Sequence, residues 1–227
     1  MIALVDGDIV AYRCAASAEK EDRDISFMRA DIMMNDLMSE TGGTSHKVFL
    51  SGKRENNFRF KVNSEYKANR VDMVRPIHLE ATKEFLVTHW QAQVCQDYEA
   101  DDGMGIEQRE QGTVICSIDK DLLQVPGLHY NLVKKITTII TQDEGLKRFY
   151  TQVLTGDRTD NVFGLQGIGP VKAAKLLEGL LPEEYYNACR EAYNDDDRLH
   201  NNCQLLWVLR EGNKHWETPK NHVQEIL

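Results

Sequence analysis

Acidic side chains occur in four tight clusters along this chain, each at the boundary of an expected helix or strand. The clusters are Asp6 with Asp8, Glu99 with Asp101 and Asp102, Asp119 with Asp121, and Asp157 with Asp160. Carboxylates that lie close together repel one another unless a positive charge binds among them. Divalent cations such as Mg²⁺ or Mn²⁺ take oxygen ligands, and two ions about 4 Å apart can activate a water molecule and stabilise the leaving oxygen of a phosphodiester. Once such ions are bound, the acidic clusters could therefore become a surface that attracts phosphate.

A glycine-rich turn follows the last acidic cluster. The stretch GLQGIGPVKAAKLLEG, at 164–179, has the pattern of a helix-hairpin-helix. Gly167 and Gly169 allow a tight turn with exposed backbone N–H groups, and Pro170 suits the first position of the next helix. The positive end of that helix, together with Lys172 and Lys175, could hold a phosphate without reading bases. The alternative is an ordinary structural turn between two helices.

A basic stretch lies within an acidic protein. The chain has a net charge of −9, yet 47–75 contains eight basic and three acidic residues. Within it, basic residues alternate with aromatic ones: Phe58, Arg59, Phe60, Tyr66, Lys67 and Arg70. This composition suits stacking on single-stranded bases and contact with backbone phosphates, although a solvated basic face would look similar.

The elements that must position these groups alternate along the first part of the chain. We expect strands at 2–5, 47–50, 93–96, 113–118 and 134–140, and helices at 26–41, 78–91, 98–112 and 142–154. After Pro182 the chain is expected to be helical, most clearly at 202–210. Sites in open α/β sheets form beyond the carboxyl ends of strands, where several of the acidic clusters fall. The pattern predicts an α/β core with a central, mostly parallel sheet flanked by helices, followed by a helical C-terminal part.

Composition excludes several other classes of protein. The hydrophobic fraction of 41% and the charged fraction of 28% are those of a globular domain. No apolar run is long enough to span a membrane, and the N-terminus lacks the basic region of a secretory signal, so we expect a cytoplasmic protein with no membrane partner. The cysteines are isolated, without a CxxC pair, and are expected to be reduced core residues: Cys14, Cys95, Cys116, Cys189 and Cys203.

Five motifs, in this order, resemble those of the 5′→3′ exonuclease and flap-endonuclease family, and most closely its short bacteriophage-type members. They are LVDGD, YKANR, EADD, SIDKDLLQ and TGDRTDN, and the Gly-Ile-Gly-Pro hairpin follows them. The resemblance covers about 2–180. It implies a PIN-like nuclease core at 1–142, with a short basic arch region at about 52–76, and a helical part at 143–227 that contains the DNA-gripping hairpin.

The resemblance also implies a role for each motif. Asp6, Glu99 and Asp101 would hold the first metal, and Asp119, Asp121 and Asp157 the second, with Asp102 and Asp160 bridging or acting through water. Lys67 and Arg70 would steer the scissile phosphate onto the metals, beside Asp6 and Asp119 in the catalytic set. The DNA-binding residues would be Arg59, Lys67, Arg70, Gly167, Gly169, Lys172 and Lys175, and the hairpin could also bind K⁺.

The partner implied by the resemblance is DNA with a 5′ end, a flap or a nick, or an RNA–DNA hybrid. The expected activity is that of a structure-selective 5′ nuclease, acting as a monomer. Its setting would be phage DNA replication, primer removal or degradation of host DNA, in the host cytoplasm if a phage encodes the protein.

One departure from the family pattern concerns the second strand. The family usually carries an aspartate just after it, but this chain has Ser51 and Gly52 there, and neither Asp36 nor Glu55 matches it. One ligand of the first metal is therefore expected to be missing, which leaves room for a weaker or altered activity. Asp8 is not a family ligand and is expected to be a turn residue or a hydrogen-bonding neighbour of the site.

Two other functions compete with a 5′ nuclease. Haloacid-dehalogenase-like phosphatases share motifs similar to VDGD, FLS and GDRTD, but their last motif follows a strand, whereas 142–154 is expected to be a helix. The second alternative is a non-catalytic nucleic-acid-binding homologue with a weakened site, which the missing aspartate favours. Solvated turns and helix caps would explain any one acidic cluster, but they explain all four together less well.

Overall fold

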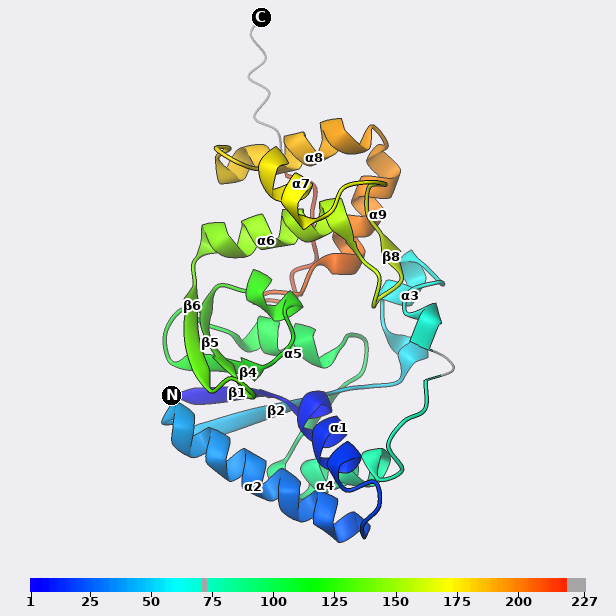
Figure 1. Ribbon diagram of the computed structural model, residues 1–227. Coiled ribbons are helices and arrows are strands. Elements are labelled where there is room, and N and C mark those ends of the chain that lie inside the picture. Colours follow the sequence, from blue (N-terminus) through cyan, green and yellow to red (C-terminus); the bar gives the residue numbers. More distant parts are fainter. Residues whose placement is uncertain (71–72, 220–227) are drawn as a thin grey trace, which may run out of the picture.

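The computed structural model describes residues 1–70 and 73–219. Its described part centres on a six-stranded sheet with the order β3-β2-β1-β4-β5-β6 (Figure 1). The strands are β1 (Ile2–Asp6), β2 (Ser45–Ser51), β3 (Gln93–Cys95), β4 (Thr113–Ser117), β5 (Gly127–Asn131) and β6 (Ile136–Ile140). Only β6 runs antiparallel to its neighbour, so the mostly parallel sheet expected from the sequence is confirmed. Strand β5 was not expected.

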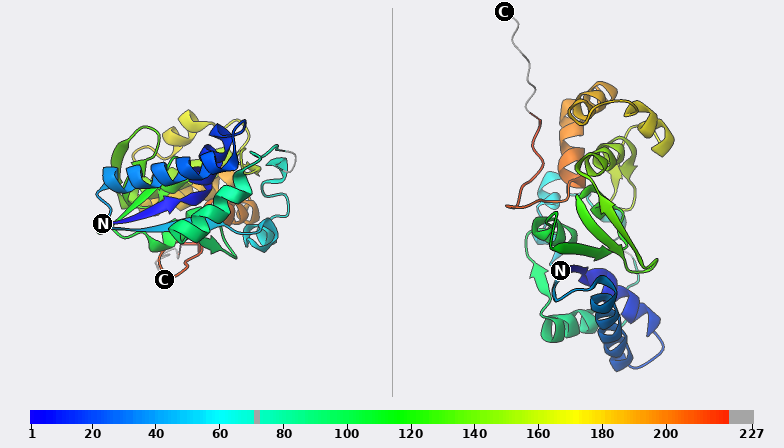
Figure 2. Two further views of the ribbon diagram at one scale, coloured as in Figure 1. Left: turned by 90° about the horizontal axis from the view of Figure 1, so that it is seen from below. Right: turned by 90° about the vertical axis from the view of Figure 1, so that its left-hand side faces the viewer.

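Helices cover both faces of the sheet, because strand residues alternate between two apolar cores. Ala3 and Val5 face one core with α1 (Gly7–Ser17), α2 (Arg23–Thr41) and α4 (Leu79–Trp90). Leu4 faces the other core, with α5 (Ala100–Glu107). Figure 2 shows the sheet between these layers. Strands buried on both faces are typical of parallel sheets.

The C-terminal part is mainly helical up to Leu206, as expected, but the segment expected most clearly, 202–210, is helical only as far as Leu206. It contains α6 (Gln142–Thr155), α7 (Pro170–Leu176), α8 (Tyr185–Tyr193) and α9 (Asp196–Leu206), with a short hairpin of β7 (Gly156–Asp157) and β8 (Val162–Phe163) between α6 and α7. Thr141 and Glu144 form a capping box at the start of α6.

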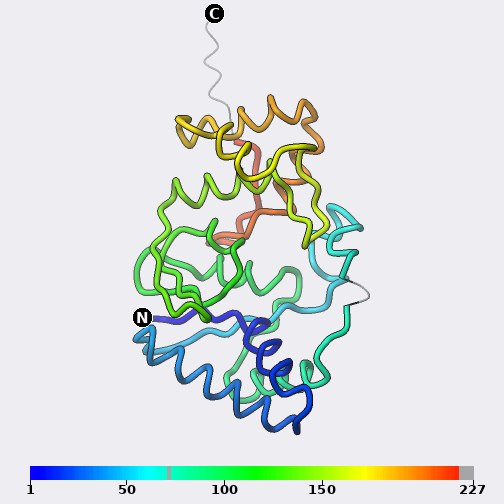
Figure 3. The backbone as a smooth tube through the Cα atoms, viewed as in Figure 1, coloured from blue at the N-terminus to red at the C-terminus, as the bar shows by residue number. Residues whose placement is uncertain are grey.

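The basic stretch after β2 folds against this helical part. It forms short helical turns at Arg54–Asn56, α3 (Arg59–Val62) and Ala68–Arg70. The backbone trace in Figure 3 shows this stretch beside β8 and α9, which are far from it in sequence. Tyr66 belongs to the same apolar core as α6, α8 and α9, so the stretch expected as an arch is tied to the helical part.

Two expectations from composition can be compared with the structure. Among the described helices, none combines the length and the apolar character needed to cross a membrane. All five cysteines are buried free thiols.

Candidate metal centre

Three carboxylates meet where the sheet faces the helical part. Asp121, Asp157 and Asp160, here called the hairpin group, each offer an oxygen within 4.8 Å of the others. Asp121 begins the turn after β4, and the other two lie on the β7–β8 hairpin. Gln152 of α6 holds this group by donating to Asp121 Oδ1 at 2.8 Å and to Asp157 Oδ2 at 3.3 Å. Three oxygen ligands at this spacing fit a divalent cation.

A second group of acids, here called the strand-end group, consists of Asp6, Glu99 and Asp101. Asp6 ends β1 and is 3% exposed; one of its oxygens accepts the N–H of Ile9 at 3.0 Å, and the other accepts the hydroxyl of Ser117 at 2.6 Å. Burial, with the charges of Asp8 and Asp119, raises the pKa of Asp6 to about 7. Burial, with the charges of Asp119, Asp6 and Glu99, raises the pKa of Asp101 well above its usual range.

Asp119 is close enough to acids of both groups to act on their charge. Its negative charge raises the pKa of Asp6, of Asp101 and of Asp121. Burial is the largest cause of the shift at Asp121, and the charges of the neighbouring acids add to it. Together they raise the pKa of Asp121 to about 7. Carboxylates with raised pKa values hold protons near neutral pH, and a bound divalent cation would take the place of those protons. The donor set and its excess negative charge therefore fit metal binding.

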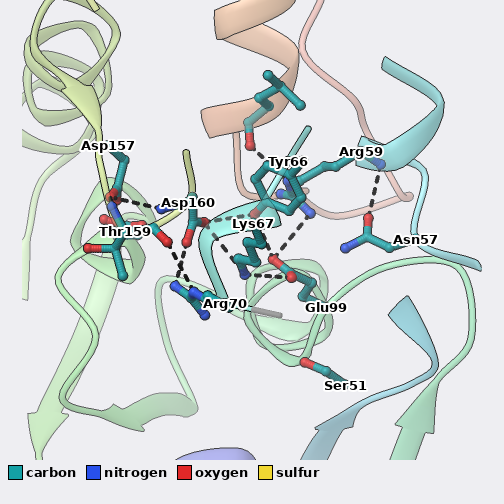
Figure 4. Close-up of polar contacts among 12 residues, drawn as sticks. Ser51, Asn57, Arg59, Tyr66, Lys67, Arg70, Glu99, Asp157, Thr159 and Asp160 are labelled. Carbon is teal, nitrogen blue, oxygen red and sulfur yellow. Dashed lines mark hydrogen bonds and ion pairs between the residues drawn. The ribbon is translucent and has the colours of Figure 1, made fainter. Parts of the chain in front are cut away.

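Two cationic side chains of the basic stretch form ion pairs with acids of both groups (Figure 4). Lys67 Nζ is 2.6 Å from Glu99 Oε1 and 3.5 Å from Asp160 Oδ2, and an Arg70 nitrogen is 2.5 Å from Asp160 Oδ1. Burial alone would raise the pKa of Glu99, but Lys67 and Arg59 outweigh it and lower that pKa. The structure thus places the predicted basic pair at the junction of the two acidic groups.

Asp102 and Arg59 are paired with each other in the interior of the protein. Asp102 is fully buried, and its oxygens accept both Arg59 guanidinium nitrogens at 2.6 and 2.9 Å. They also accept the N–H groups of Glu99 and Leu209 at 3.0 Å each. Arg59 is 3% exposed and also donates to the carbonyl of Leu205. These two residues thus form a buried ion pair, and the bridging or water-mediated metal role of Asp102 and the DNA contact of Arg59 stay predictions.

Three further side chains shape the site without having been assigned to it. The hydroxyl of Tyr66 contacts Glu99 and Asp160, and its ring is only 2% exposed, so the expectation that it stacks on bases is wrong. Gln152 and Ser117 hold acids, as described above. Nothing in the sequence separates Gln152 from other polar residues of an amphipathic helix.

Comparison with known proteins identifies the family of this chain. A family model described as "5'-3' exonuclease, N-terminal resolvase-like domain" matches residues 1–158. The chain belongs to this 5′-3′ exonuclease family.

Relatives with curated names support the same assignment. DNA polymerase I of Bacillus caldotenax is 27% identical over 78% of this chain, but the match spans only 23% of that polymerase. The 5′-3′ exonuclease of Mycoplasma genitalium is 24% identical over 89% of this chain and 78% of its own length.

Solved structures share the fold. T5 5′-exonuclease with bound divalent zinc ions has a TM-score of 0.72 at 15% identity, covering 91% of this chain and 88% of that one. The bacteriophage T5 flap endonuclease in a pseudo-enzyme–product complex with DNA and metal ions has a TM-score of 0.69 at 14% identity, over 91% and 88%.

In this exonuclease-family chain, Ser51 and Gly52, where the aspartate was expected, differ in the room they leave for a side chain. The Ser51 hydroxyl accepts the N–H of Ala100 at 3.0 Å and so holds the start of α5. At Gly52 an added Cβ would lie 2.1 Å from the carbonyl oxygen of Cys95. A side chain at 52 is therefore excluded unless the backbone shifts.

Asp8 lies beside this position. One of its oxygens accepts the N–H of Ser51 at 2.9 Å, and the other is 2.6 Å from Lys83 Nζ of α4. This placement is the hydrogen-bonding role expected from the sequence.

We predict opposite outcomes for aspartate at the two neighbouring positions. Ser51→Asp can keep the bond to the α5 N-terminus, where a negative charge is favourable, and adds a carboxylate at the sheet edge. It should tighten Mn²⁺ binding by roughly tenfold, about 1.4 kcal/mol, measured by isothermal titration calorimetry. Gly52→Asp should instead lower the free energy of unfolding by about 1–3 kcal/mol in urea, because it overpacks the backbone. Unchanged Mn²⁺ affinity in Ser51→Asp would show that position 51 lies outside the ligand sphere.

The glycine turn lies outside the acidic site. Gly167 has φ 76°, which favours glycine, and α7 begins at Pro170 as predicted. A Cβ at Gly167 or Gly169 would meet nothing within 4 Å, so this backbone faces open space. Lys172 Nζ donates to the Gly167 carbonyl at 2.9 Å, and Lys175 is exposed. The connection from α6 to α7 spans 156–169 and includes β7 and β8, so it is longer than a simple turn between two helices.

Proposed function

We propose that this chain is a divalent-metal-dependent, structure-selective 5′ nuclease that hydrolyses DNA phosphodiesters. The observation that carries the proposal is the placement of two cations, Lys67 and Arg70, at the junction of two acidic groups that share Asp119 as a neighbour. Positive charge near the oxygens of a phosphodiester stabilises the transition state of its hydrolysis, and cationic side chains and acids that could hold a metal ion meet here.

The residues divide into metal-holding and phosphate-holding sets. The hairpin group would hold one Mg²⁺ or Mn²⁺ ion and the strand-end group a second, with Asp119 between them. Bound divalent cations supply Lewis acidity and lower the pKa of water. Lys67 and Arg70 would bind the non-bridging oxygens of the scissile phosphate, since their present partners are acids at the same place. Ser117 and Gln152 would keep the acids in position.

The DNA duplex would extend toward the helical part. Gly167 and Gly169 expose backbone groups, and Lys172 and Lys175 add positive charge, so this turn would grip a phosphate some distance from the cut and could bind K⁺ through its carbonyls. We propose 1–142 as the nuclease core, whose metal site would be completed by Asp157 and Asp160, and 143–227 as the helical part that also grips DNA. Substrates would be flaps, nicks or 5′ ends in DNA or RNA–DNA hybrids. The protein would act as a monomer in phage replication, primer removal or degradation of host DNA.

A paired assay tests the proposal. A 5′-labelled flap and a nicked duplex should be cleaved with Mg²⁺ and left intact with EDTA, while a small phosphate monoester should not turn over. Turnover of the ester alone would favour the phosphatase alternative, although Asp157 follows helix α6, whereas that class needs a strand. DNA binding without cleavage would favour the non-catalytic homologue with a weakened site. This is the second candidate function, because an aspartate at position 52 would clash with the Cys95 carbonyl.

A further inference from the structure

One hydroxyl connects the two acidic groups directly (Figure 4). The oxygen of Tyr66 lies 3.0 Å from Glu99 Oε2, in the strand-end group, and 2.8 Å from Asp160 Oδ2, in the hairpin group. Glu99 precedes α5, and Asp160 lies on the β7–β8 hairpin, 61 positions further along the chain. The distance between these two carboxylates therefore depends on a side chain from a third segment.

The chemistry of a phenol limits what this contact can do. A tyrosine hydroxyl has one proton and donates one strong hydrogen bond at a time, so it cannot neutralise two carboxylates. Lys67, the next residue, supplies the charge, since its Nζ contacts the same two acids. If Lys67 turns to a phosphate, the hydroxyl of Tyr66 remains between Glu99 and Asp160. Its contribution is geometric, whereas that of Lys67 is electrostatic.

The ring of Tyr66 is held firmly enough to set a distance. It is 2% exposed and packs edge-on against Phe60, with ring centroids 5.6 Å apart, within the apolar core of the helical part. Its carbonyl accepts a bond from Arg54 at 3.0 Å. The next residue, Lys67, has a left-handed backbone (φ 53°), and its N–H donates to the carbonyl of Asp160 at 2.9 Å. Side chain and backbone are thus both anchored to the hairpin.

We propose that Tyr66 is a positioning residue, which sets the separation of Glu99 and Asp160 and so the spacing of the two metal-holding groups. The inference rests on the proposed metal-dependent function. Groups that orient metal ligands commonly change metal affinity 10–100-fold when removed, although they do not touch the ion.

The test is Tyr66→Phe, which keeps the ring and removes the hydroxyl. We expect the dissociation constant for Mn²⁺, measured by calorimetry, to rise about tenfold. For cleavage of a flap, kcat should fall at limiting Mg²⁺ and recover in part at high Mg²⁺, while KM for DNA stays unchanged. Tyr193→Phe is the matched control, because Tyr193 is also buried in the helical core and donates to a backbone carbonyl, that of Val153, rather than to an acid.

Each result decides something specific. If the native protein neither binds Mn²⁺ nor cleaves DNA, the proposed function fails. If the native protein does both and Tyr66→Phe matches it, the positioning role is wrong while the function stands. Equal loss of Mn²⁺ affinity in both tyrosine variants would reduce the effect to a lost buried hydroxyl and would also overturn the inference. Tyr66→Met, which fills the space without a hydroxyl, should repeat the Tyr66→Phe result; if neither variant folds, Tyr66 is a core residue and the proposal is withdrawn.

Discussion

Replacing Asp119 with asparagine is expected to slow cleavage of a flap at least about a thousandfold, which is about 4 kcal/mol of transition-state stabilisation. Asp119 is the acid whose charge reaches Asp6, Asp101 and Asp121, so its removal weakens both candidate metal-holding groups. The asparagine keeps the shape and can still accept the N–H of Asp121, which now lies 2.8 Å from Asp119 Oδ1. Single-turnover cleavage at saturating Mg²⁺ measures the chemical step.

DNA affinity separates catalysis from binding in this variant. Binding of the same flap without metal should be unchanged or slightly tighter in Asp119→Asn, since one negative charge is lost near the phosphate. Asp36→Asn is the control, because Asp36 is an exposed acid in the middle of α2, and it should cleave like the native protein. Near-native cleavage by Asp119→Asn would refute the central place given to Asp119.

The layout of the fold was predictable because its signals are local. Apolar runs such as 2–5 and 113–118 end in acids, and parallel strands bring their carboxyl ends to one edge. Helix α1 was missed because its buried positions include small residues, such as Ala11 and Cys14, which give a weak periodic signal. Its start depends on Asp6, whose side chain accepts the N–H of Ile9 and thus caps the helix that follows β1.

The details of the site were less predictable because they depend on contacts between distant segments. Asp101 and Asp102 are identical in type and adjacent, but each helical step turns the side chain by ~100°. Asp101 therefore faces the other acids, while Asp102 faces Arg59, 43 positions earlier in the chain. A buried arginine from a basic stretch cannot be told from an exposed one by sequence, because its partner is set by tertiary packing.

Replacing Lys67 with methionine should change metal binding and cleavage in opposite directions. In this structure Lys67 Nζ lies 2.6 Å from Glu99 Oε1 and 3.5 Å from Asp160 Oδ2. It therefore competes with a metal for those carboxylate oxygens. Without it, Mn²⁺ should bind about tenfold more tightly, about 1.4 kcal/mol by calorimetry. Cleavage should nevertheless slow by about 10²–10³-fold, the usual cost of removing one preorganised group that stabilises transition-state charge.

This pair of readouts distinguishes a phosphate-binding lysine from one that only neutralises acids. A lysine that only neutralises acids would lose stability on substitution without slowing cleavage by the folded protein, because Glu99 would keep only one cation, Arg59, 3.8 Å away, and circular dichroism would show the unfolding. Lys61→Met is the matched control, since Lys61 is an exposed lysine of the same basic stretch. Tighter metal binding with slower cleavage in Lys67→Met, and neither change in Lys61→Met, would mean that Lys67 leaves the acids when metal enters and acts on the phosphate instead. Unchanged cleavage in Lys67→Met would leave the positive charge at this junction without a catalytic role and would move the search for the phosphate-binding group to Arg70.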